Sequence, residues 1–167
     1  MENLMTYALT VFMSFFAVMN PIANTPIFLG LTVGENKESK KKIAKTATFT
    51  AFIIVVSFVI AGKYIFELFG LTIPAFKITG GILIFYIGFE MLMSQKAKIH
   101  SSDSEDKNNI SISPLAIPIL AGPGTIVAAM NNVTNANLIQ IGIVISIFAL
   151  MIYLTYLAFS FSDLIVK

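Results

Sequence analysis

Five stretches of this sequence are apolar enough, and long enough, to cross a lipid bilayer as α-helices, which takes roughly 20 residues each. The predicted spans are 4–31, 47–66, 75–93, 114–130 and 138–161. Hydrophobic residues make up 56% of the chain and charged residues only 12%, whereas a soluble domain carries about 25% charged residues. A soluble fold could not hide so much apolar surface. We therefore predict an all-α, polytopic transmembrane helix bundle whose first partner is the lipid bilayer.

The polar segments between the spans predict the orientation of the chain. Segments 34–45 and 95–113, together with the C-terminal Lys167, hold nine of the eleven lysines. Because lysine-rich loops stay in the cytoplasm, we expect the N-terminus outside and the C-terminus in the cytoplasm. The net charge of +2, without a basic stripe, gives no reason to expect a nucleic-acid partner.

Two similar proline motifs suggest an internal repeat. The letters PIANTP occupy positions 21–26 and PILAGP positions 118–123, so the second motif lies 97 residues after the first. With three helices per half, the two halves would face opposite ways, as in many secondary transporters. We predict a first three-helix repeat over 1–96, a polar cytoplasmic linker over 97–113, and a second repeat over 114–167 that lacks its last helix. Coincidence is the alternative explanation of so short a match.

Paired prolines should break both helices, because each proline removes a backbone donor and clashes with the preceding turn. Backbone groups freed at membrane depth must be buried in protein or line a polar cavity. Half-helix N-termini would then face a shared midplane site for a small zwitterionic solute, with Na⁺ or H⁺ as a coupling ion. The alternative is that the prolines only kink two helices. The residues expected to form the site are Asn20, Pro21, Asn24, Thr25, Pro26, Pro118, Gly122, Pro123, Gly124 and Thr125.

Other residues carry weaker predictions. Lys77 and Glu90 bracket the third span and could line a pathway, although Glu90 could equally lie at headgroup level. Gly80-Gly81 predicts that another helix approaches closely. The asparagines at 131, 132, 135 and 137 are interpreted as a solvated turn.

Enzymatic sites find little support in this sequence. There is one histidine, His100, in a polar loop, and there is no cysteine, so we expect neither a metal site nor a cofactor. The aspartates lie outside the predicted spans, which argues against an intramembrane aspartyl protease. We therefore expect that the protein is not an enzyme.

Three segments of the chain resemble the MarC family of bacterial and archaeal inner-membrane proteins. They read NPIANTPIFLGL at 20–31, PAFKITGGILIF at 74–85 and PLAIPILAGPGTI at 114–126, and the lysine-rich loop after the first also fits. Lys77 stands where the family is expected to carry an arginine. The resemblance covers nearly the whole chain in the right order.

This resemblance implies six helices in a 3+3 inverted arrangement in the plasma membrane, of which this chain would supply five. It also implies either an uncharacterised function or transport of small neutral amino acids such as glycine and alanine. The alternative function is a membrane protein without transport activity, which assists envelope assembly or docks a partner through its lysine-rich loop. A flux measurement separates the two.

Overall fold

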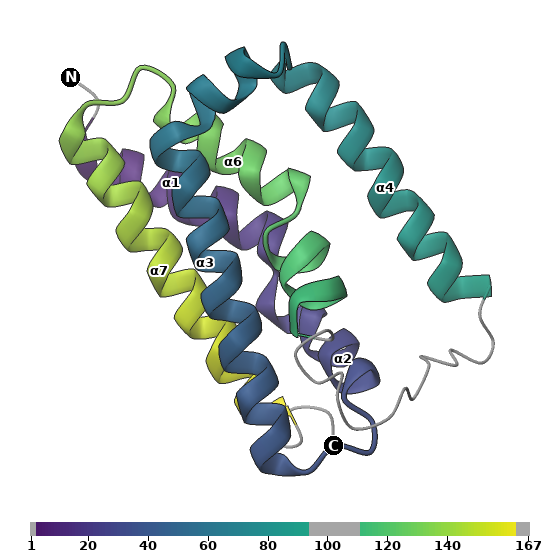
Figure 1. The fold of residues 1–167 in the computed structure, drawn as a ribbon. Helices are drawn as coiled ribbons and strands as arrows, with labels where there is room; N and C mark the ends of the chain where they lie inside the picture. The colour runs from purple at the N-terminus through teal and green to yellow at the C-terminus, as the bar shows by residue number, and fades with distance from the viewer. Residues whose placement is uncertain (1–2, 94–110, 163–167) are drawn as a thin grey trace.

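The computed structural model describes residues 3–93 and 111–162, and every regular element in these two ranges is a helix (Figure 1). In chain order the elements are α1 (Leu4–Met19), α2 (Pro21–Leu31), α3 (Lys37–Leu68), α4 (Ile73–Met93), the π-helix η1 (Ser111–Leu120), α6 (Pro123–Val133) and α7 (Leu138–Ser160). The first and fourth predicted spans are therefore each divided into two helices, α1–α2 and η1–α6. The predicted break in both helices is confirmed.

Asparagines begin the long helices by accepting hydrogen bonds from free backbone amides of the first turn. The Asn3 side chain accepts from the Met5 amide, and the Asn36 side chain accepts from the Ser39 amide at 2.8 Å. Asn137 and Gln140 form a reciprocal capping box at the start of α7. The Asn36 cap makes α3 begin at Lys37, ten residues before the predicted span, so most of the predicted loop 34–45 is helix.

The antiparallel pair α3 and α7 forms the centre of the bundle (Figure 1). Helices α1 and α2 pack against α7, whereas η1 and α6 pack against α3. Buried aromatic rings join the layers: Phe28 of α2 stacks on Phe159 of α7 with centroids 4.5 Å apart, and Phe15 of α1 meets Phe148 of α7 at 5.0 Å. Helix α4 contacts the bundle mainly through α6, and its Phe76 meets Phe66 of α3 with ring centroids 5.1 Å apart.

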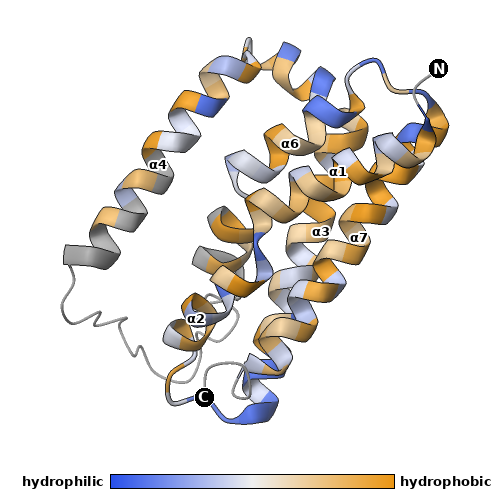
Figure 2. Cartoon of the chain, turned by 180° about the vertical axis from the view of Figure 1, so that it is seen from behind, coloured by the Kyte–Doolittle hydropathy of each residue, from blue (hydrophilic) through white to orange (hydrophobic). Residues whose placement is uncertain are grey.

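The outside of the bundle carries many large apolar side chains, which is expected where lipid replaces water. Large side chains such as Ile60, Phe85 and Leu138 are exposed. Figure 2 shows hydrophobic residues over the helices, while hydrophilic residues gather at the helix ends and turns. Within the described ranges, three stretches are long and apolar enough to cross a membrane, namely Leu4–Leu31, Lys37–Leu68 and Leu138–Ser160.

Some of the features predicted from the sequence fall outside the described residues. Most of the predicted linker lies there, and Ser111 already belongs to η1. Glu90 lies on α4 and Pro118 on η1, but their side chains are not among those described.

Candidate functional site

The first break, between α1 and α2, satisfies its own polar groups. Asn20 adopts φ 29° and ψ 79°, outside the helical region. The following Pro21 disfavours the helical conformation at Asn20. The Asn20 side-chain oxygen accepts from the Ala23 amide at 3.1 Å, and the Asn24 side-chain amide donates to the Met19 carbonyl at 2.6 Å. The Thr25 hydroxyl donates to the Pro21 carbonyl at 2.8 Å. The side chains predicted to bind a solute here therefore make hydrogen bonds to the backbone around the break, and their role in binding stays a prediction.

The second break, between η1 and α6, has no such side chains. Pro123 is the first residue of α6 and Gly122 is its N-cap, which has no side chain to accept a hydrogen bond. The first amides of a helix have no intrahelical acceptor. The start of α6 therefore presents uncapped backbone donors and the positive end of the helix dipole.

The two breaks do not occupy the same place in the two proline motifs. Each break adjoins one proline, Pro21 in the first pair and Pro123 in the second, so the spacing of the breaks is 123 − 21 = 102 residues and not 97. Pro26 lies inside α2 with its ring exposed, and Pro118 lies in the wider turns of η1. Measured from the breaks, α2 and α6 correspond, because each contains 11 residues and begins with proline.

A pocket of about 530 Å³ adjoins the second break, between α1, α4 and α6. Its wall consists of Ser14, Ala17, Val18, Lys77, Gly80, Gly81, Pro123, Gly124, Val127, Ala128, Asn131 and Asn132. Two glycines allow this arrangement. A Cβ on Gly80 would lie 2.1 Å from the Pro123 Cβ, and a Cβ on Gly124 would lie 3.0 Å from the Val18 Cγ1. The predicted close approach at Gly80-Gly81 is thus confirmed for Gly80.

A hydrogen-bond chain connects two walls of this pocket. The Asn132 side-chain amide donates to the Ser14 hydroxyl and to the Ala128 carbonyl, both at 2.8 Å. The Ser14 hydroxyl donates in turn to the Val11 carbonyl at 2.9 Å. Since both donors of the Asn132 amide are used, its side-chain oxygen is the atom able to accept from a ligand.

A second, more polar pocket of about 400 Å³ adjoins the first. Both pockets have Asn131 and Asn132 in their walls. The other residues of this second pocket are Thr6, Tyr7, Thr10, Thr134, Asn135, Ala136 and Gln140. The Tyr7 hydroxyl donates to the Asn132 carbonyl at the boundary. The two pockets therefore meet at Asn131 and Asn132, with the more polar pocket further from the start of α6.

The structure brings together some of the predicted site residues and separates others. Pro123, Gly124 and the pathway candidate Lys77 line the α1–α4–α6 pocket, whereas Thr125 is buried beside it. The pocket takes no residue from the first break. Ser14 is not among the residues predicted from the sequence, and Asn131 and Asn132 were predicted only to form a turn. Their spacing of seven and eight residues from Gly124 places them on the same helix face, which was the available signal.

Comparisons with known proteins agree with this architecture. The family described as MarC family integral membrane protein matches residues 5–167. The UPF0056 membrane protein YvbG of Bacillus subtilis is 38% identical over 96% of this chain and 79% of its own length. A UPF0056 membrane protein of Buchnera aphidicola is 39% identical, covering 88% of this chain and 72% of the relative.

An archaeal relative extends the similarity. The UPF0056 membrane protein MJ1677 of Methanocaldococcus jannaschii is 37% identical over 78% of this chain and 66% of its own length. No solved structure matches the chain. The family match covers both helix breaks, all three walls of the pocket and the lysine-rich start of α3. The chain belongs to the MarC family of integral membrane proteins.

Proposed function

We propose that the chain is the core of a secondary transporter for small neutral amino acids of the glycine or alanine type, without enzymatic activity. One observation carries the proposal: the pocket places the Lys77 side chain and the uncapped start of α6 around the same space. Both groups are positive, one by its ammonium and the other by its helix dipole. A solute carboxylate is the complementary group.

The end of the pocket two turns further along α6 suits the solute's ammonium group. An ammonium needs acceptors, and the Asn132 side-chain oxygen is oriented by the bonds that its amide makes to Ser14 and Ala128. Asn131 adds a second amide at the boundary between the two pockets. The small side chains of Ala17, Gly80 and Gly81 leave room for a solute. Positive groups and amide acceptors therefore line one pocket, which is the combination that a zwitterion needs.

The helix order supports an inverted arrangement as part of this proposal. Helix α3 packs on η1 and α6, and α7 packs on α1 and α2, so each long helix covers the broken helix of the other half. In this arrangement α1–α2–α3 corresponds to η1–α6–α7, and a sixth helix would correspond to α4. Movement of one half against the other would expose the pocket to each side in turn, driven by Na⁺ or H⁺. The lysine-rich start of α3 would face the cytoplasm and the N-terminus the outside of the plasma membrane.

A flux assay tests the transport proposal directly. The purified chain is reconstituted into vesicles, and uptake of radiolabelled glycine and alanine is compared with protein-free vesicles. We expect uptake that saturates, with Lys77→Gln raising the KM about tenfold, because a hydrogen-bonded charge contributes roughly 1.5–3 kcal/mol.

The matched control is Lys63→Gln, which removes the same charge from a residue outside the pocket wall. Its KM should stay within twofold of the unchanged chain. Uptake no greater than in protein-free vesicles would contradict the proposal and favour the docking or assembly function.

A further inference from the structure

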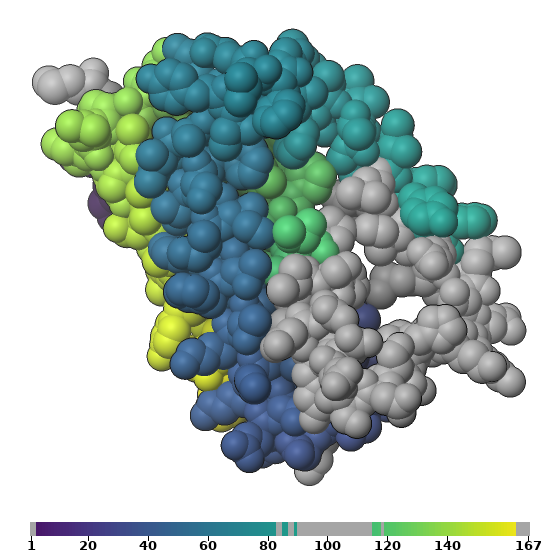
Figure 3. Space-filling model, viewed as in Figure 1, coloured from purple at the N-terminus to yellow at the C-terminus, as the bar shows by residue number. Residues whose placement is uncertain are grey.

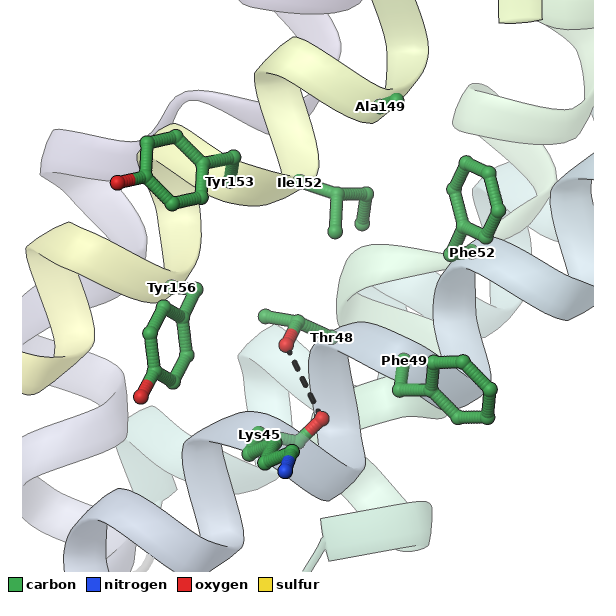
Figure 4. A pocket seen from close by; sticks show the side chains of 8 residues that line it. All are labelled: Lys45, Thr48, Phe49, Phe52, Ala149, Ile152, Tyr153 and Tyr156. Carbon is green, nitrogen blue, oxygen red and sulfur yellow. Dashed lines mark hydrogen bonds between the residues drawn. The ribbon is translucent and has the colours of Figure 1, made fainter.

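A groove between α3 and α7 lies apart from the solute pocket and has a volume of about 480 Å³. Helix α3 contributes Lys45, Thr48, Phe49 and Phe52, and α7 contributes Ala149, Ile152, Tyr153 and Tyr156 (Figure 4). The two helices lie side by side on the face shown in Figure 3. Because they run antiparallel, Lys45 and Tyr156 lie at one end of the groove, and Phe52 and Ala149 lie at the other.

The polar groups of the groove gather at the lysine end. The Lys45 side chain is exposed, and no carboxylate among residues 3–93 and 111–162 pairs with its ammonium. The Thr48 hydroxyl is already used, since it donates to the Ala44 carbonyl at 2.8 Å and the Lys45 carbonyl at 3.2 Å. Phe49, which is 64% exposed, presents only carbon to whatever occupies the groove.

The position of the groove along α3 matches the boundary between the lipid headgroups and the hydrocarbon core. Helix α3 has 32 residues and is about 48 Å long, whereas the hydrocarbon core is about 30 Å thick. From Lys45 to the end of α3 the helix rises about 35 Å. Lys45 therefore falls where lipid phosphates lie, and the apolar end of the groove extends into the hydrocarbon.

The charge around this end is strongly positive. Residues 37–45 contain five lysines and one glutamate, a net charge of +4. Basic clusters at the cytoplasmic ends of membrane helices attract anionic lipid headgroups. A zwitterionic lipid would bring its own ammonium group close to these lysines, which the charges disfavour.

We propose that the α3–α7 groove binds one anionic phospholipid of the phosphatidylglycerol type. The phosphate lies against the Lys45 ammonium and accepts from the Tyr156 hydroxyl. One acyl chain lies along Phe49, Ile152 and Phe52. The site is independent of the proposed solute pocket, because the two share no residue.

The chain offers a clean reporter for this site, because it contains no tryptophan. The Phe49→Trp variant places a single fluorophore in the groove. It is reconstituted into mixed vesicles of phosphatidylglycerol and phosphatidylcholine, in which either one or the other lipid carries brominated, quenching acyl chains. The reference reporter is Leu150→Trp, which lies next to Ala149 at similar depth but outside the groove and is 47% exposed.

At the Phe49→Trp reporter we expect phosphatidylglycerol to be preferred about fivefold over phosphatidylcholine. This factor is typical of one lysine at an anionic membrane surface. The preference at the Leu150→Trp reporter should be close to one. Adding Lys45→Gln should abolish the preference in the groove, and Lys45→Arg should keep it. Lys42→Gln, the matched control, removes the same charge from an exposed residue outside the groove and should leave the preference within twofold.

Three results would overturn the assignment. Equal preference at the two reporters would mean that the groove binds bulk lipid without selection. Equal losses from Lys45→Gln and Lys42→Gln would mean diffuse attraction by the whole lysine cluster. A Phe49→Trp reporter that neither brominated lipid quenches, in a chain that crosslinks as a dimer, would show that a second copy occupies the groove.

Discussion

The two helix breaks of this chain are built alike, but a side chain caps the following helix only at the first break. Both α2 and α6 contain 11 residues and begin with proline. At the first break, Asn20 caps the Ala23 amide and Asn24 bonds to the Met19 carbonyl, so the polar groups are satisfied internally. At the second break Gly122 offers no cap, and the start of α6 adjoins the pocket that contains Lys77. A broken membrane helix is therefore not by itself a binding site. A break is the better candidate when the helix that follows it is uncapped and begins beside a pocket.

The largest effect is expected at Gly80, which holds α4 against the second break. In Gly80→Ala the new Cβ would overlap the Pro123 ring, so α4 and α6 must separate. We expect a loss of about 3 kcal/mol in the free energy of unfolding, at the upper end of overpacking effects. SDS-induced unfolding followed by circular dichroism measures it.

Gly81 supplies the control for this prediction. Nothing lies within 4 Å of a Cβ at Gly81, so Gly81→Ala should be neutral or stabilise the helix slightly. If both variants lose the same stability, contact with Pro123 is not what positions the second break.

The sequence predicted the helical class and the two broken spans from local patterns, whereas the pathway role of Lys77 stays a prediction. It missed the start of α3, because lysines favour helix once Asn36 caps the first turn, whereas hydropathy reads them as loop. It could not decide which proline of each pair ends a helix, because a proline is tolerated at the first helical position and also on an exposed face such as that of Pro26. The roles of Ser14 and Asn132 depend on the packing of α1 against α6. The two residues are more than a hundred positions apart in the sequence.

The next largest effect should follow Asn20→Ala at the first break. Alanine removes the cap on Ala23 and is strained at φ 29°, so we expect a loss of about 2 kcal/mol of stability. The KM for glycine or alanine should not change, because the first break contributes no residue to the pocket. A large rise in KM with little loss of stability would contradict the division of roles between the two breaks.

A smaller effect is expected for Asn132→Ala, which removes the link between α1 and α6. The bonds to Ser14 and Ala128 should contribute about 1 kcal/mol, measured by the same unfolding titration. Unlike Asn20→Ala, this variant should also raise the KM, because the Asn132 side-chain oxygen faces the proposed ammonium group. Thr10→Ala, at a helical residue that lines the second pocket and not the first, is the control and should leave the KM unchanged.

Gly122→Ser should cause the smallest change in stability. It is also the most direct test of the difference between the capped first break and the uncapped second break. Gly122 is buried and has φ −77° and ψ 172°, extended values that a serine N-cap also adopts, so serine causes no φ/ψ strain. The serine hydroxyl would accept from the first amides of α6, as Asn20 does for α2, and stability should rise by a few tenths of a kcal/mol. If those amides bind the solute carboxylate, the same hydroxyl competes with it, and the KM should rise while unfolding becomes slightly harder. Gly122→Ala, which adds a Cβ without an acceptor, separates competition from bulk: an equal rise in KM for both variants would mean that size matters at this break and that its open amides do not.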